Sequence, residues 1–105
     1  MKKCCVALLA LLPLTALAYP IDVEKNLGAG LKIDVQSFDT AYDIGAATLT
    51  NYGTTAAQCK VTFRNGPEAP RVRRVAVGAN QTVDVSARFN REILKLRVAV
   101  DCKAQ

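Results

Sequence analysis

The chain has 105 residues, 14 of them Lys or Arg and 9 of them Asp or Glu, and it contains no histidine. This length suffices for one domain, and the lack of histidine removes the commonest general base and metal ligand of enzymes. The sequence also has no phosphate-binding G-x-x-x-x-G-K-S/T loop and no G-x-S-x-G nucleophile elbow, so we expect a protein that is not an enzyme, with no catalytic residue, cofactor or metal ion.

The first eighteen residues have the three parts of a secretory signal. A pair of lysines precedes an apolar run over residues 6–14, and Ala16 and Ala18 supply the small side chains that signal peptidase needs. We expect cleavage after Ala18, which would deliver one domain of residues 19–105 to the periplasm or the cell exterior with no membrane span. A retained anchor is the alternative, but the apolar run is shorter than the ~20 residues that span a bilayer.

Apolar and polar residues alternate in several segments of the chain after the signal, with Gly, Pro or Asn between the segments. This period of two is typical of half-buried β-strands. Six or seven short strands without a helix predict an all-β protein, a small antiparallel β-sandwich. In chain order, the expected strands are residues 19–25, 31–36, 44–52, 58–64, 71–77, 83–89 and 94–102.

Two of these strands each carry one cysteine, Cys59 and Cys102, at a position that we expect to face the core, as we do for Val61 and Phe63. In an exported protein an even pair of cysteines is typical of a disulfide. Closing a loop of about 44 residues would stabilise the fold by roughly 4 kcal/mol in the chain-entropy model. The bond could join the two sheets or two neighbours in one sheet. A metal site is disfavoured, because two thiols without a histidine cannot complete a tetrahedron.

The sequence also allows a more local prediction for each of three segments. Residues 37–43 are mostly polar, and we expect a connection there. In residues 71–77 the arginines and valines share no single alternation, so we expect a β-bulge near Arg73. The alternation of the last strand starts at Leu94, which we expect to face the core.

Four short runs resemble bacterial immunoglobulin-like modules. They are Leu-Thr-Asn-Tyr-Gly at residues 49–53, Cys-Lys-Val-Thr-Phe at 59–63, Val-Ala-Val at 75–77 and Val-Asp-Val at 83–85. In those modules a strand ending in L-x-N-x-G precedes an alternating strand and a later V-x-V before a turn. The resemblance implies an immunoglobulin-like form of the sandwich and no particular ligand.

Two other runs are similar to a family of short exported proteins of Gram-negative bacteria, some of which carry the name phosphoglycerate kinase. They are Tyr-Pro-Ile-Asp-Val-Glu-Lys at residues 19–25 and Phe-Arg-Asn-Gly-Pro-Glu-Ala-Pro-Arg at 63–71. Phosphoglycerate kinases are large two-domain enzymes with nucleotide and triose-phosphate sites, and this chain departs from them everywhere. The resemblance therefore implies an exported protein and no kinase activity.

Basic residues concentrate in the second half of the chain. Residues 60–105 hold ten bases and four acids, whereas residues 19–59 hold two bases and five acids. If the strand at 58–64 pairs with the last strand, their outward side chains form one basic stripe, which Arg88 would extend. The members of that stripe are Lys60, Arg64, Lys95 and Arg97. A second cluster, beside the proline-bounded loop, consists of Arg71, Arg73 and Arg74.

Six of these side chains are the candidate binding residues: Arg64, Arg71, Arg73, Arg74, Lys95 and Arg97. Because Arg holds phosphate or carboxylate bidentately, they favour an anionic envelope component or an acidic protein as the partner. Nucleic acid is disfavoured, since Phe63 and Phe89 are expected in the core and not free to stack on bases. The structural alternative is charge that only keeps a sheet soluble. The functional alternative is a structural or assembly role, in which an exposed strand edge pairs with another chain.

Overall fold

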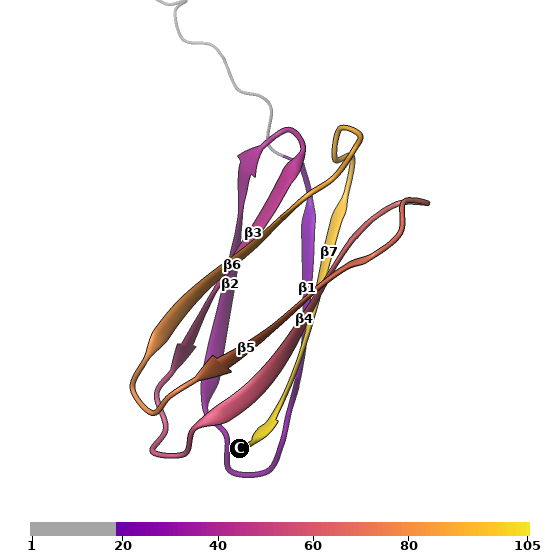
Figure 1. Ribbon diagram of the computed structural model, residues 1–105. Helices are drawn as coiled ribbons and strands as arrows, with labels where there is room; N and C mark the ends of the chain where they lie inside the picture. The colour runs from indigo at the N-terminus through magenta and orange to yellow at the C-terminus, as the bar shows by residue number, and fades with distance from the viewer. Residues whose placement is uncertain (1–18) are drawn as a thin grey trace, which may run out of the picture.

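The computed structural model describes residues 19–105, and the signal and cleavage site expected over residues 1–18 lie outside this part. Its seven strands are β1 (Ile21–Leu27), β2 (Ile33–Ala41), β3 (Ile44–Asn51), β4 (Ala57–Asn65), β5 (Arg71–Val77), β6 (Thr82–Arg88) and β7 (Leu96–Ala104). One sheet has the strand order β1-β7-β4-β5 and the other β2-β3-β6 (Figure 1). An all-β, sandwich-like fold is therefore confirmed. Within the described part no helix could cross a membrane.

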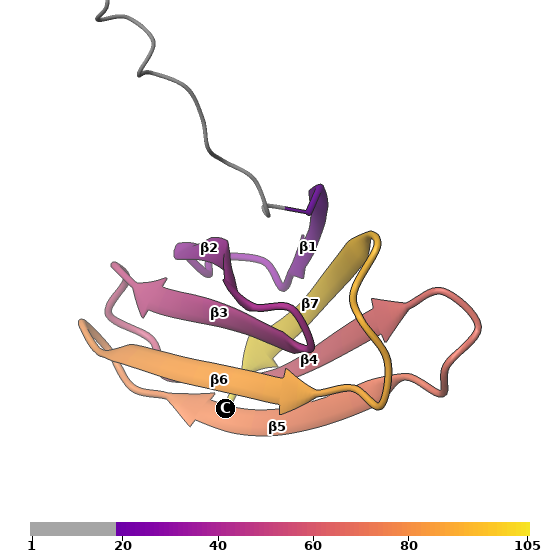
Figure 2. The same ribbon diagram turned by 90° about the horizontal axis from the view of Figure 1, so that it is seen from above.

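The two sheets lie face to face, and their edge strands approach each other at both sides. Seen from above, β1 lies beside β2 at one side, and β5 lies beside β6 at the other (Figure 2). The β2–β3 and β4–β5 connections join neighbours in one sheet, whereas each of the other connections carries the chain from one sheet to the other. These repeated crossings tie the two layers together.

The pairing of β1 with β7 is parallel, which corrects the prediction of an antiparallel sandwich. The register runs from Ile21 opposite Leu96 to Leu27 opposite Cys102, while the other strand pairs are antiparallel. The backbone N–H of Leu96 donates to the carbonyl of Pro20 (3.0 Å), so both strands start at the same end. No hairpin joins β1 to β7, and the sequence therefore could not predict their relative direction.

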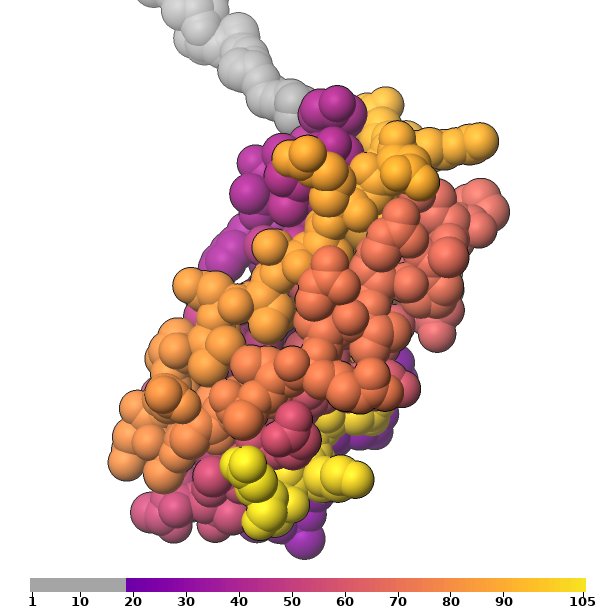
Figure 3. Space-filling view, viewed as in Figure 1, coloured from indigo at the N-terminus to yellow at the C-terminus, as the bar shows by residue number. Residues whose placement is uncertain are grey.

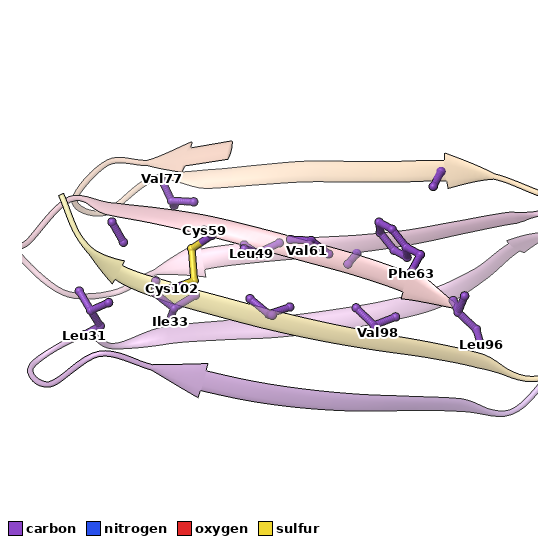
Figure 4. Close-up of a cluster of buried hydrophobic side chains, with 14 of the residues drawn as sticks. Leu31, Ile33, Leu49, Cys59, Val61, Phe63, Val77, Leu96, Val98 and Cys102 are labelled. Atoms are coloured by element: carbon purple, nitrogen blue, oxygen red, sulfur yellow. A yellow bond between two sulfur atoms is a disulfide. The ribbon is translucent and has the colours of Figure 1, made fainter. Parts of the chain in front are cut away.

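The core between the sheets is built largely by the alternation of β3, β4 and β7. Cys59, Val61 and Phe63 of β4 are at most 1% exposed, as predicted. The predicted disulfide joins Cys59 to Cys102, which lie directly opposite each other on β4 and β7 (Figure 4). Of the two arrangements that the sequence allowed, the bond is the one within a single sheet. Phe63 and Leu96 fill the other end of the core (Figure 4).

The inward side of β3 carries small residues where the two sheets are close together. Gly45 is buried, and a Cβ added there would lie 3.0 Å from both terminal methyl carbons of Leu96 and 3.3 Å from the ring of Phe63. Ala47, the next inward residue, is 1% exposed. Gly45 therefore lets the β3 backbone pack directly against side chains of the opposite sheet.

β2 extends through most of the connection that was expected at residues 37–43. It pairs with β3 from Ile33 to Ala41 except at Thr40, where the register shifts between Asp39 and Ala41. The prediction of a connection is wrong because the backbone ladder offered by β3 outweighs the polar composition of this segment.

Two further local predictions are wrong. β5 pairs with β4 without a bulge, because Arg71 and Arg73 both occupy the core-facing side of a regular strand. Leu94 is 75% exposed and Ile93 is 3% exposed, the reverse of the expected alternation. The cause is a loop before β7, in which the backbone N–H of Ile93 donates to the carbonyl of Tyr42 (2.7 Å).

Buried asparagines end β3 and β4 and hold the loops around them. The amide of Asn51 donates to the carbonyls of Thr55 (2.9 Å) and Val77 (3.3 Å). Its side-chain oxygen accepts from the backbone N–H of Gly53 (2.9 Å). The amide of Asn65 makes similar bonds to the loop before β7. The Leu-Thr-Asn-Tyr-Gly run is thus an architectural motif, a strand end whose side chain closes its own turn.

Candidate anion-binding face

The outward side of the four-stranded sheet carries basic residues at adjacent positions of neighbouring strands. Arg64 of β4 lies directly opposite Arg97 of β7. Four residues away along β4, Lys60 lies between Arg74 of β5 and Asp101 of β7. We call this outward surface the basic face. Its exposed cations are Lys60, Arg64, Arg74, Arg97 and Lys103.

None of these five cations has an ion-pair partner among residues 19–105. The ion pairs of this part are Arg71 with Glu68, Arg88 with Asp43, and Lys95 with Asp22. Like charges that lie directly opposite on neighbouring strands repel each other. The carboxylates of Asp22, Glu24 and Asp101 lie on the same side of the sheet, so the five cations leave this side with an excess of two positive charges, which an anionic ligand would neutralise.

Two hollows lie on the basic face. The smaller, of about 360 Å³, has Arg64 and Arg97 in its lining together with two acidic residues of β1. The larger, of about 590 Å³, lies at the disulfide end and has Lys60 and Arg74 in its lining. Because four residues of extended strand separate Arg64 from Lys60, the two cationic rows are about 13 Å apart.

Three of the six candidate binding residues, Arg64, Arg74 and Arg97, lie on the basic face. Lys95 precedes β7, and its Nζ lies 3.1 Å from a carboxylate oxygen of an aspartate in β1. Arg88, which was expected to extend the stripe, lies on β6 in the other sheet. Of the expected basic stripe, Lys60, Arg64 and Arg97 therefore share one side of β4 and β7, whereas Lys95 lies before β7 and Arg88 lies on the other sheet.

Arg71 and Arg73 lie on the opposite side of β5 from Arg74, at the seam with β6. Figure 3 shows these two strands in orange tones, side by side on the near face. Nε of Arg73 donates to the carbonyl of Ser86 (3.1 Å), and Nε of Arg71 donates to that of the last residue of β6 (3.2 Å). The guanidinium carbon of Arg71 also lies 5.1 Å from the centre of the Phe89 ring. The expected cluster of three arginines is thus divided between two sides of the strand, and two of its members cover the edge of β6.

Glu68 is a structural anchor that the sequence reasoning missed. Its carboxylate accepts hydrogen bonds from the backbone N–H groups of Asn90 (3.0 Å) and Arg91 (3.1 Å). It also accepts from the amide of Asn65 (3.1 Å) and lies 3.5 Å from the guanidinium of Arg71. Desolvation raises the pKa of Glu68, but these donors outweigh it, and the pKa lies below its ordinary value of 4.5. The sequence pointed to this role only weakly, through an acidic residue in a proline-bounded loop that has arginines close to it on both sides.

The structure also adds Asp101 and Lys103 to the surroundings of the predicted stripe. Both line the larger hollow. The sequence could have predicted that both residues face outward, because the period of two continues from Arg97 to the end of β7. Over the described residues, no three His, Cys, Asp or Glu side chains gather as a metal site.

No protein-family model matches the chain, and no curated protein or solved structure matches it either.

Proposed function

We propose that this chain is an exported, non-enzymatic binding module whose basic face holds an anionic component of the cell envelope or an acidic protein. The observation that carries the proposal is that two pairs of cations occupy directly opposite positions on that face, Arg64 with Arg97 and Lys60 with Arg74. These opposed cations lower stability, and an anionic partner that binds both members of a pair would remove that cost. The disulfide is in keeping with an oxidising compartment such as the periplasm or the cell exterior.

We further infer that the sandwich is an immunoglobulin-like fold in which β2, and not β1, corresponds to the first immunoglobulin strand. In immunoglobulin domains the second strand pairs with the fifth in one sheet, and the third with the sixth in the other. The pairings of β3 with β6 and of β4 with β7 correspond to these, and β2 then corresponds to the first strand. β1 would occupy the place of the last immunoglobulin strand, in parallel orientation. This likeness concerns architecture and implies no ligand.

Co-sedimentation with phosphatidylglycerol vesicles tests the binding proposal, with neutral phosphatidylcholine vesicles for comparison and soluble polyglutamate as a competitor. We expect binding to the anionic vesicles that weakens steeply as salt rises and that polyglutamate displaces. The double variant Arg64→Glu and Arg97→Glu should abolish this binding. Lys32→Glu with Arg91→Glu makes the same change of charge away from the basic face and is the matched control. Equal binding by the two double variants would refute the proposal.

Pairing of a strand edge with another chain is a second candidate function. It is favoured by the small contribution of β1 to the core. None of the buried core residues of the described part lies on β1, while Ile21 and Leu27 are only partly buried against the core. β1 is therefore held mainly by its backbone ladder to β7, which local opening can release.

A fluorescent peptide with the sequence of residues 20–28 tests this second candidate. If β1 exchanges, the anisotropy of the peptide should rise with protein concentration and should change little with salt, because backbone hydrogen bonds make the contact. A scrambled peptide of the same composition is the control. Equal anisotropy for both peptides at every protein concentration would exclude exchange of β1.

A further inference from the structure

The larger hollow of the basic face is lined by two kinds of polar side chain. One kind is cationic, and the other consists of a carboxylate and two amides, which form hydrogen bonds without positive charge. The hollow extends across all four strands of the sheet, because cross-strand neighbours from β1 to β5 contribute to it. The lining side chains are Lys60, Arg74, Lys103, Asp101, Gln58 and Asn26.

These side chains are not engaged with one another. Lys60 and Asp101 are direct cross-strand neighbours, yet no ion pair joins them. None of the six lining side chains has a hydrogen bond to another part of the chain within residues 19–105. Their donors and acceptors are therefore available to a ligand.

Asp101 determines which anions suit this hollow. Its carboxylate lies between Asn26 and Lys60 in one cross-strand row and is the acidic member of the lining of this hollow. There it repels ligands that place several negative charges close together, such as polyphosphate. A carboxylate is also a strong acceptor for hydroxyl groups. A ligand with one anionic group beside several hydroxyls would use both kinds of side chain.

The disulfide keeps the hollow in shape. Cys59 and Cys102 are each flanked along the chain by two residues of the lining. The bond on the core side therefore fixes how β4 and β7 present these residues on the outward side. A site that is ordered before binding loses less entropy when the ligand arrives.

We propose that the disulfide-end hollow binds an acidic sugar, with Lys60 and Arg74 on its carboxylate or phosphate and Asp101 on its hydroxyls. This inference rests on the proposed binding function of the basic face, which it deepens by naming the class of ligand. The volume of about 590 Å³ falls within the ~300–1,000 Å³ that is usual for small-ligand sites. Uronate and sugar-phosphate units of polysaccharides have the required chemistry.

Calorimetric titration with trigalacturonate, which carries one carboxylate on each ring, tests the inference. We expect saturable binding of trigalacturonate and none of neutral galactotriose. Asp101→Asn should weaken the binding of trigalacturonate about tenfold, the size of one charge-assisted hydrogen bond, although it makes the face more positive. Asp34→Asn makes the same change on the other sheet and should leave the affinity unchanged.

Vesicle binding by the same variants separates this inference from the proposed function. Asp101→Asn should bind phosphatidylglycerol vesicles at least as well as the unchanged protein, because it removes a negative charge from the face. If the protein binds these vesicles but not trigalacturonate, the sugar inference is overturned and the proposed function stands. If Asp101→Asn strengthens the binding of trigalacturonate, Asp101 only repels anions, and the inference is again overturned. If neither ligand binds, the proposed function itself fails.

Discussion

Cys59 and Cys102 lie directly opposite each other on β4 and β7, with their Cα atoms 4.1 Å apart. This is the close type of antiparallel pair, in which facing side chains are nearest to each other. The bond fixes the register of the two central strands of the sheet. The same register brings Arg64 opposite Arg97 on the outward side. Core stability and the basic face therefore depend on one strand pair.

Replacement of both cysteines by alanine should lower the free energy of unfolding by about 2–4 kcal/mol, because the unfolded chain regains the freedom that the bond removes. Urea denaturation followed by circular dichroism measures this loss. The unchanged protein with its disulfide reduced is the control and should behave like the double variant. A loss below about 0.5 kcal/mol in both would show that the bond adds little to this fold.

Arg73 and Arg74 are neighbours in β5, and we expect opposite effects from their replacement. Arg73→Ala removes a hydrogen bond to the edge of β6, so it should lower the free energy of unfolding by about 1 kcal/mol. It should have little effect on vesicle binding. Arg74→Ala should change the free energy of unfolding by less than about 0.5 kcal/mol and should weaken vesicle binding. Urea denaturation and co-sedimentation distinguish the two effects. The reverse pattern would mean that the β5–β6 seam, and not the basic face, binds the anion.

Glu68 should make the stability of the fold sensitive to acid. Its pKa in the folded protein lies below the ordinary value of 4.5, so its contribution is complete above that value and is lost as the pH falls through the folded pKa. Glu68→Gln should be less stable than the unchanged protein at neutral pH, and the difference should shrink below about pH 4.5. Denaturation midpoints measured across this pH range test the effect. The exposed Glu24→Gln is the control, and a Glu68→Gln difference that stays constant with pH would contradict the account.

Gly45→Ala should lower the free energy of unfolding by about 1–3 kcal/mol, since its Cβ would lie 3.0 Å from the methyl carbons of Leu96. Thermal or urea denaturation measures the loss. Ala46→Val adds volume to the outward side of the same strand and should change stability by less than about 0.5 kcal/mol. Equal effects of the two substitutions would argue against a close approach of the sheets at Gly45.

Alternation alone predicted the core positions of β4. A strand with one buried side requires a period of two, so Cys59, Val61 and Phe63 could be assigned to the core and Lys60 and Arg64 to the surface. The same reasoning placed most strands within a few residues of their observed bounds. What alternation does not contain is the identity of a strand's neighbour. For this reason the sheet location of the disulfide and the parallel partner of β1 needed the structure.

The arginines of β5 show a second limit of sequence patterns. Arg71 and Arg73 suggested a bulge because charged residues were not expected on the core-facing side of a regular strand. β5 is an edge strand, and a long side chain at an edge can bend out of the core and bond to the neighbouring sheet. Position at an edge is a property of the whole fold, and the sequence of this segment does not contain it.

Amide chemical-shift mapping of the ¹⁵N-labelled protein with phosphatidylglycerol bicelles tests most directly whether the basic face is the binding surface. We expect the largest shifts at the residues on the outward side of β4, β5 and β7, around Lys60, Arg64, Arg74 and Arg97, and we expect these shifts to disappear at high salt. Shifts confined to the three-stranded sheet, or to the seam that Arg71 and Arg73 cover, would contradict the account.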